Sequence, residues 1–214
     1  MRVGGLAPAL VLADAQTPEQ LAAQVSEAEA ALRALLRQVH GEVGDIRARG
    51  VEVEGDWRVT GNLILSANGS YNDAHYTAYP NAPCPAGVAA PCNLTGRPVY
   101  QAPRWVGNLT ARYDTELNNG AKPFALVQYT YRSGVFGSVD DAAYSRIEGY
   151  SLVNARIGAR FGGHYEASIW VNNLFDKVYL QTLGAASIPG AGAFGTTGQL
   201  GTPQTWGVTL RAEY

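Results

Sequence analysis

Apolar and polar residues alternate along most of this chain, and the alternation is clearest at its C-terminal end. Residues 204–214 read Q-T-W-G-V-T-L-R-A-E-Y, with apolar side chains at every second position and polar ones between them. Because successive side chains of a strand point to opposite faces, this segment predicts a β-strand with one apolar and one polar face. In a membrane barrel such a strand inserts into the wall. The apolar positions are Trp206, Val208, Leu210, Ala212 and Tyr214.

The same period of two recurs in earlier segments that are long enough to cross a membrane at a tilt. Short turns join some of them, whereas long connections at residues 77–103, 134–149 and 176–203 join the others. Short turns at one end and long loops at the other are typical of an outer-membrane barrel. We therefore predict an all-β chain, an antiparallel up-and-down transmembrane β-barrel segment of about seven strands, which is an incomplete barrel. The earlier segments are 51–58, 63–72, 104–114, 123–132, 150–161 and 165–175.

Aromatic and charged side chains fall where this arrangement requires them. Aromatic residues lie near the short-turn end of several strands, where rings settle at a membrane–water interface. Charged residues of both signs occupy the polar face, and we interpret them as a cross-strand charge ladder. The aromatic positions are Trp57, Tyr113, Phe161, Tyr165 and Tyr214, and the charged positions are Glu52, Glu54, Arg112, Asp114, Arg132, Arg156, Arg160 and Glu166.

The N-terminal residues follow a different pattern, which predicts a separate segment 1–40 ahead of the barrel segment 41–214. Residues 17–39 predict an amphipathic α-helix, since a threonine, a proline and a glutamine suit its first turn and apolar residues follow at helical spacing. Residues 1–15 combine an arginine, a short apolar run and an A-x-A site, as an export signal does. An irregular N-terminus is the alternative.

Composition narrows the classes of function. Lysine and arginine number 16 against 18 aspartates and glutamates, which leaves no basic surface for nucleic acid. Charged residues make up only 16% of the chain, while glycine numbers 25 and tyrosine 12, as suits a β-rich membrane wall. No stretch approaches the roughly 20 apolar residues of a spanning helix. If the chain enters a bilayer, such as the outer-membrane lipid that the strand pattern indicates, strands must cross it.

Few residues indicate chemistry. Cys84 and Cys92 share a loop rich in proline and alanine, and we interpret them as a small disulfide formed in an oxidising compartment, with two free thiols as the alternative. The three histidines lie far apart, so we expect no metal site. Asp140 and Asp141 are interpreted as a solvated turn, and the glycine-rich residues 184–201 lack the strand and helix of a dinucleotide loop. We expect neither a cofactor nor an enzymatic activity.

Several segments resemble the C-terminal part of the β-barrel of TonB-dependent outer-membrane receptors. Residues 43–57 read VGDIRARGVEVEGDW, 94–105 read LTGRPVYQAPRW, 171–179 read VNNLFDKVY and 203–214 read PQTWGVTLRAEY. The NNLFDKxY run and the aromatic end of the last strand are fairly specific together. The resemblance covers about residues 41–214. It implies a barrel in the bacterial outer membrane that takes up iron chelates, cobalamin or sugars, using energy passed through TonB.

The chain also departs from that family. Receptors of this type have roughly 22 strands around a plugged lumen, of which this chain supplies about a third. We recognise neither a plug domain nor a TonB box before the barrel segment, residues 1–40 show no resemblance, and Gln204 stands where the family more often has arginine. We therefore expect a truncated receptor that cannot transport alone and that self-associates or pairs with companion barrel strands from another chain.

A ligand is expected at the outer loops, because loops carry recognition while the barrel holds them in place. Tyrosine and arginine side chains in these loops can stack on an anionic ligand or pair with it. An ordered loop with interfacial aromatics is the alternative. The candidate residues are Tyr76, Tyr79, Arg97, Tyr100 and Arg104.

Two other architectures are compatible with the alternation. One is a water-soluble β-sandwich that acts as a binding module and carries an N-terminal helix. It fits less well, because one face carries charges at mid-strand and the other sets small alanines beside large rings, which a close-packed core tolerates poorly. The other is a small self-standing barrel of about eight strands, with residues 42–50 contributing one more.

Overall fold

The computed structural model describes residues 44–187 and 194–213. The chain divides into two compact units, Met1–Glu42 and Val43–Tyr214, and every described residue belongs to the second. The signal-like start, the helix at residues 17–39 and Tyr214 lie outside the described residues and stay predictions. Within the described residues, no helix is long and apolar enough to cross a bilayer.

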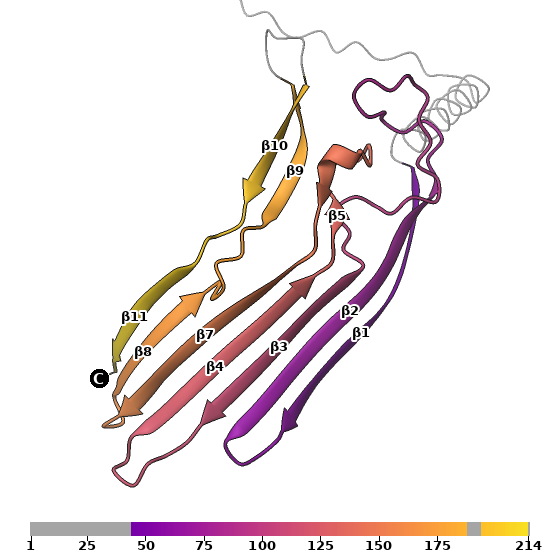
Figure 1. The fold of residues 1–214 in the computed structure, drawn as a ribbon. Helices are drawn as coiled ribbons and strands as arrows, with labels where there is room; N and C mark the ends of the chain where they lie inside the picture. Colours follow the sequence, from indigo (N-terminus) through magenta and orange to yellow (C-terminus); the bar gives the residue numbers. More distant parts are fainter. Residues whose placement is uncertain (1–43, 188–193, 214) are drawn as a thin grey trace, which may run out of the picture. The chain divides into compact units, whose positions relative to one another are not determined.

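Seven strands form one antiparallel sheet, in the order β1-β2-β3-β4-β7-β8-β11 (Figure 1). Tight turns join strands at one end of the sheet, and long connections join them at the other (Figure 1). The predicted class, an antiparallel seven-stranded segment of an incomplete barrel, is confirmed for the described residues. The strands are β1 (Asp45–Arg58), β2 (Leu63–Ala78), β3 (Trp105–Asp114), β4 (Lys122–Arg132), β7 (Tyr150–Phe161), β8 (Tyr165–Asn172) and β11 (Thr205–Ala212).

Two connections that we predicted as plain loops contain short strands of their own. Residues 134–149 form a small two-stranded excursion with a 3₁₀ turn, and residues 180–187 pair antiparallel with residues 194–200 in a second two-stranded sheet. The prediction of plain loops was wrong at these two places. The strands were not recognised because their sequences are rich in glycine, threonine and alanine and show no alternation of apolar with polar residues. The elements are β5 (Val135–Phe136), η1 (Ala143–Ser145), β6 (Arg146–Ile147), β9 (Leu180–Ser187) and β10 (Phe194–Leu200).

Strand β1 begins earlier than the alternation predicts. It starts at Asp45, and its pairing with β2 runs without a shift in register from Ile46 to Arg58. Residues 45–50 therefore extend β1 and supply no extra strand within the described residues, so the prediction of a small closed barrel with a further strand there was wrong. The sequence conceals the extension because its apolar residues change phase: Ile46 and Val51 are an odd number of positions apart and point to opposite faces.

One face of the sheet is apolar and open to its surroundings. The strand registers set apolar residues opposite one another, so that Ile169 lies beside Ile157 on one side and Val208 on the other. Exposure of the apolar side chains reaches 74% at Trp206 and 79% at Leu210. A soluble protein covers a face of this kind, whereas lipid is a suitable solvent for it. No second sheet covers it within the described residues, so the β-sandwich prediction was wrong.

Aromatic rings border the apolar face at both ends. At the loop end the rings of Tyr71 and Trp105 lie 4.6 Å apart, and at the turn end those of Phe161 and Tyr165 lie 5.9 Å apart. On β3, Trp105 and Tyr113 are separated by about 26 Å of strand, which a tilt of about 40° reduces to about 20 Å. This height is close to the apolar band of an outer-membrane barrel. The turn-end border, as predicted, includes Trp57, Tyr113, Phe161 and Tyr165.

The opposite face is polar and carries linked ion pairs. Arg156 binds Glu166 at 2.6 Å, and Arg160 binds the same carboxylate at 3.1 Å. Arg160 also lies 3.7 Å from Asp114, which Arg112 holds at 2.6 Å. The predicted cross-strand charge ladder is confirmed for these residues. In the described part of the chain, no ion pair involves Glu52, Glu54 or Arg132.

The sheet has two open edges within the described residues, since β1 pairs only with β2 and β11 only with β8. In lipid, an open edge leaves backbone N–H and C=O groups without partners, at several kcal/mol for each group. These seven strands therefore need further strands beside them to make a closed wall in a bilayer.

Candidate functional site

The long connection between β2 and β3 folds back along the end of β2. The N–H of Gly96 donates to the carbonyl of Tyr76 at 2.7 Å, and the N–H of Val99 donates to that of Ala74 at 3.1 Å. A disulfide joins Cys84 to Cys92 within the same connection. The connection is thereby held as an ordered wall along the part of β2 that extends beyond β3.

A small apolar core forms within this connection and takes up two of the residues expected to bind a ligand. Tyr76 and Tyr79 are only 2% and 3% exposed, and their ring centroids are 5.0 Å apart. Ala82 and Leu94 complete the core. Burial raises the pKa of the Tyr79 phenol, as expected for a ring removed from water. The two rings pack the connection and present little surface to a ligand.

An acidic pair in the connection between β4 and β7 is buried, so the predicted solvated turn was wrong. Asp140 accepts hydrogen bonds from the Tyr144 hydroxyl at 2.7 Å and from the Ala142 N–H at 3.2 Å. The guanidinium of Arg97 binds Asp141 and so ties this connection to the one between β2 and β3. The partner lies far away in the sequence, which is why the pattern of residues around Asp141 gave no sign of it.

The order of this acidic turn is expected to depend on pH. Burial alone raises the pKa of Asp140, but hydrogen bonds from Tyr144, Ser138 and the Ala142 N–H outweigh burial and hold the pKa below its usual value. A carboxyl of this kind contributes stability above its unfolded pKa and loses that contribution as the pH falls through its folded pKa. The amide protection of residues 138–145, corrected for intrinsic exchange, should therefore decrease when the pH is lowered below about 4.

Asp140→Asn is the matched control for this effect. The amide keeps the size of the side chain but removes its charge, so protection is expected to be weaker at neutral pH and unchanged on acidification. Protection of wild-type residues 138–145 that is the same at about pH 2 and about pH 6 would contradict the role given to this carboxylate.

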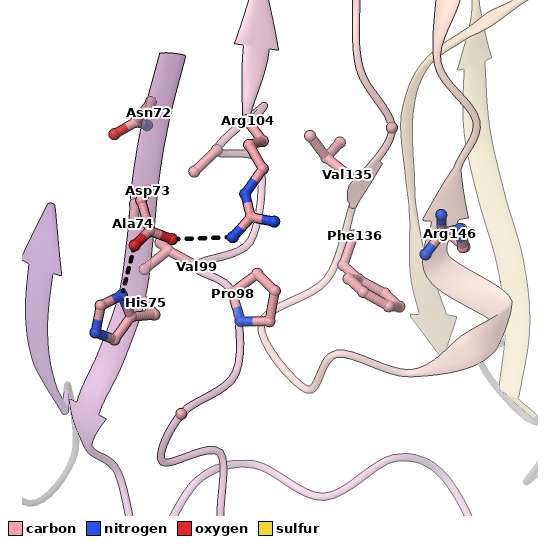
Figure 2. Close-up of a pocket in the computed structure, with 13 residues that line it drawn as sticks. Asn72, Asp73, Ala74, His75, Pro98, Val99, Arg104, Val135, Phe136 and Arg146 are labelled. Carbon is pink, nitrogen blue, oxygen red and sulfur yellow. Dashed lines mark hydrogen bonds and ion pairs between the residues drawn. The ribbon is translucent and has the colours of Figure 1, made fainter. Parts of the chain in front are cut away.

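A cavity of about 470 Å³ opens between the edge of β2, the returning connection and β5 (Figure 2). Its lining includes Asp73 and His75 of β2 and Arg104, which immediately precedes β3. Phe136 and Arg146 of the β5–β6 excursion line it as well. Figure 2 shows Arg104 reaching toward Asp73, with Phe136 and Arg146 across the cavity from Asp73. A volume of this size is ordinary for a small-molecule site.

The two arginines that line the cavity can each bind a further anion. Arg104 binds Asp73 at 3.1 Å, and Arg146 lies 3.3 Å from Glu148 with its guanidinium 5.6 Å from the ring centroid of Phe136. The two arginine side chains are still 62% and 55% exposed. Because a guanidinium presents five donors, each can bind another carboxylate or phenolate oxygen. The arrangement suits an anionic ligand with an apolar or aromatic part.

The structure separates the residues that the sequence predicted as one site. Arg104 lines the cavity, whereas Tyr76 and Tyr79 lie in the loop core. Arg97 is engaged with Asp141, and Tyr100 is exposed but does not line the cavity. Of the five predicted residues, Arg104 is the one that lines this cavity.

Other residues of the cavity could not be found from the sequence. Phe136 and Arg146 belong to a short excursion without regular alternation, and Asp73 and His75 belong to the end of β2. Only the tertiary pairing of the two long connections brings them together. No group of three or more His, Cys, Asp or Glu side chains suited to a metal ion occurs in residues 44–187 and 194–213.

The NNLFDK run forms a tight turn at the end of β8 that holds the last long connection. Asn173 is buried and has a φ of 51°, in the left-handed region. Its Nδ2 donates to the carbonyls of Lys177 and Thr202 at 2.9 and 3.2 Å, and its Oδ1 accepts from the Lys177 N–H at 2.9 Å. Its own N–H donates to Asn154 on β7 at 2.9 Å. The backbone and side chain of this one residue therefore link β7, β8 and the segment that leads to β11.

Gln204 completes this turn from the other side. Its N–H donates to the Asp176 carboxylate at 3.0 Å, and its side-chain amide donates to the Leu174 carbonyl at 2.7 Å. The glutamine that departs from the resemblance therefore has a clear structural role, because it fixes the start of β11 against the end of β8.

Comparison with known proteins identifies the family to which this sheet belongs. Residues 13–174 match the family model described as TonB dependent receptor-like, beta-barrel. The chain belongs to the TonB-dependent receptor family. Barrels of this family lie in the bacterial outer membrane, as predicted from the sequence, and they are receptors and transporters rather than a family of enzymes.

Three solved receptors share the fold of this family member. The ferric yersiniabactin uptake receptor FyuA from Yersinia pestis is 17% identical with a TM-score of 0.62, over 79% of this chain and 24% of its own. The siderophore receptor PiuA from Acinetobacter baumannii is 16% identical with a TM-score of 0.62, over 79% and 22%. BauA, the ferric preacinetobactin receptor from Acinetobacter baumannii, is 17% identical with a TM-score of 0.52, over 77% and 21%. The chain thus spans less than a quarter of the length of these receptors, and among curated proteins none matches its sequence.

The family match corrects one prediction. It begins at residue 13, so it includes part of the segment 1–40 that we expected to show no resemblance. That segment has helical spacing and none of the alternation that marks the strands, so the residues alone did not indicate kinship with a barrel. The boundary between segments 1–40 and 41–214 stays a prediction.

Proposed function

We propose that this TonB-dependent receptor chain supplies part of the wall and the outer loops of a receptor that captures an anionic ferric chelate of the siderophore class. The observation that carries the proposal is the cavity of about 470 Å³ at the loop end, where the half-exposed guanidiniums of Arg104 and Arg146 share one space with Phe136. The descriptions of the three similar receptors, for ferric yersiniabactin, a siderophore and ferric preacinetobactin, support the same class of ligand.

The chemistry of the cavity favours an anion over a sugar or cobalamin. A guanidinium binds a carboxylate with two parallel hydrogen bonds and also donates to phenolate oxygens, and many chelators hold Fe³⁺ through oxygens of these two kinds. A sugar site usually combines several stacking rings with amide groups, whereas Phe136 and the imidazole of His75 are the aromatic rings in the lining of this cavity. The volume is also small for a cofactor as large as cobalamin.

Uptake requires more than the described strands supply. The described sheet has open edges at β1 and β11, and further strands must pair there to complete a wall. Energy for uptake would come through TonB, as in the rest of the family. In this proposal the chain binds ligand at its loops and takes part in transport only within a completed wall.

Ligand binding is tested on outer membranes from cells that produce the chain. A ferric catecholate, cobalamin and a malto-oligosaccharide are titrated, and the quenching of tryptophan fluorescence reports binding, since Trp105 adjoins Arg104. We expect the ferric catecholate to bind tightest. Arg146→Gln should weaken its binding about tenfold, the usual effect of removing one charged hydrogen-bond donor.

Arg211→Gln serves as the matched control, because this arginine lies on β11 at the turn end and pairs with Glu213. It should leave the affinity for the ferric catecholate unchanged. The proposal fails if cobalamin or the oligosaccharide binds tighter than the ferric catecholate, or if both arginine variants weaken binding equally.

A further inference from the structure

The β5–β6 excursion supplies one wall of the cavity. Phe136 and Arg146 line the cavity and are register partners in the two strands of the excursion. The residue after Phe136 is Gly137, whose N–H donates to the carbonyl of Ser145 at 2.8 Å. Because Ser145 directly precedes Arg146, the pairing of Gly137 with Ser145 determines where the ring and the guanidinium of this wall lie.

The β2–β3 connection holds the excursion through three contacts. The N–H of Gln101 donates to the carbonyl of Phe136 at 2.9 Å, and Arg97 binds Asp141. Val139 packs against the small apolar core of the connection. A hydrogen bond, an ion pair and an apolar contact thus tie the excursion to the segment that forms the neighbouring wall of the cavity.

The two-stranded sheet β9–β10 also contacts the excursion, and β9 lies against β6 and η1 (Figure 1). The backbones of Gly137 and Leu183 approach so closely that a Cβ atom at position 137 would overlap the carbonyl oxygen of Leu183. Glycine is the residue that allows such an approach. Among the described residues, none that lines the cavity belongs to β9 or β10. This contact can therefore act on the cavity only through the excursion.

We propose that Gly137 is a positioning residue, through which β9 sets the place of Phe136 and Arg146 and thereby the affinity of the cavity for its ligand. Each strand of the excursion has two residues, and so short a ladder is not stable alone in water. The excursion therefore takes its position from its neighbours. The effect on a ligand rests on the function proposed above, whereas the link between β9 and the excursion can be measured without any ligand.

The first test compares amide exchange of the full 214-residue chain and of its Gly137→Ala variant in detergent micelles. The added methyl group must push β9 and the excursion apart, because it meets the backbone of Leu183 and not a side chain that could rotate away. We expect the amide protection of residues 135–147 and 180–187 to decrease at least about tenfold, as overpacking of a close contact usually causes.

Gly184→Ala is the matched control, since it adds the same methyl group to the next residue of β9, where no neighbouring atom lies within 4 Å. The protection of both segments should stay within about twofold of wild type. Wild-type protection of residues 180–187 in Gly137→Ala, or equal losses in the two variants, would overturn the proposal.

The second test adds a ferric catecholate at saturation. Ligand should increase the protection of residues 180–187 in wild type and in Gly184→Ala, although these residues do not line the cavity. Gly137→Ala should bind about tenfold more weakly and, once saturated, should show no such increase. A residue with only a structural role would lower the affinity and leave the increase intact. Ligand that protects the excursion of wild type but not β9 would overturn the proposal.

The third measurement needs neither a variant nor a ligand, so it decides even if Gly137→Ala fails to fold. Amide exchange of the wild-type chain in rising urea gives the free energy of opening of each segment. Residues 135–147 and 180–187 should open as one unit, with the same dependence on urea. Separate dependences would overturn the link through Gly137. A wild-type chain that binds none of the tested ligands would count against the proposed function alone, because this link would still be decided by exchange without ligand.

Discussion

Ile169→Arg is expected to destabilise the inserted sheet by about 2–4 kcal/mol, because it places a guanidinium on the lipid side in the middle of β8. Ile169 is 56% exposed and pairs with Ile157 and Val208, so no acidic side chain stands beside it to compensate the charge. The free energy of unfolding in lipid vesicles, measured by urea titration, gives the size of the effect. A smaller amount of the chain in the outer membrane of producing cells should accompany it.

Gln128→Arg is the control for this charge. Gln128 lies on the polar face of β4 and makes one long hydrogen bond, at 3.5 Å, with Asn154. An arginine there can reach water or neighbouring polar groups, so the loss should stay below about 1 kcal/mol. Equal losses for the two variants would show that the two faces of the sheet are not distinguished by lipid, against the assignment made from the registers.

Asn173→Ala is expected to cost about 2–4 kcal/mol and to release the last long connection. The change removes the bonds to Lys177 and Thr202 and leaves their backbone groups without partners in a buried turn. It also places alanine at a φ of 51°, which asparagine tolerates better. The free energy of unfolding and the rate of proteolytic cleavage within residues 174–204 measure the two consequences.

Two further variants separate the contributions at this turn. Asn172→Ala removes one exposed hydrogen bond of 3.4 Å to Thr205, and it should cost less than about 0.5 kcal/mol. Asn173→Gly accepts the left-handed conformation but lacks the side-chain bonds, so its cost should lie between the other two. A loss for Asn173→Ala no larger than that for Asn172→Ala would remove Asn173 from its linking role.

The sheet was predictable because a membrane wall displays its alternation without interruption. On β11, Trp206, Val208 and Leu210 face the surroundings while Thr205 and Thr209 face the polar side, and each strand could be read in the same way. The start of β1 was missed because its lipid side turns from valine to arginine beyond Val51. The period of two persists there, but the contrast between apolar and polar positions no longer reports it.

The candidate site was much less predictable, since its residues meet only through tertiary pairing. Arg104 and Arg146 come from different connections, and nothing in either neighbourhood indicates the other. Asp141 looked like part of a solvated turn because Arg97, which binds it, lies in another connection. The β9–β10 hairpin was missed for a related reason: a hairpin beyond the membrane has no lipid-facing side, so its sequence does not alternate.

The side chains of each face of the sheet are unfavourable in the environment of the other face, and this fixes the register in which the strands pair during assembly. If β7 slipped by one residue against β4, Arg156 and Arg160 would enter the hydrocarbon and Ile157 would turn away from it. Each arginine near the midplane costs about 2–4 kcal/mol. The bilayer thus disfavours a shifted register by several kcal/mol, so the native strand pairing is selected when the sheet inserts.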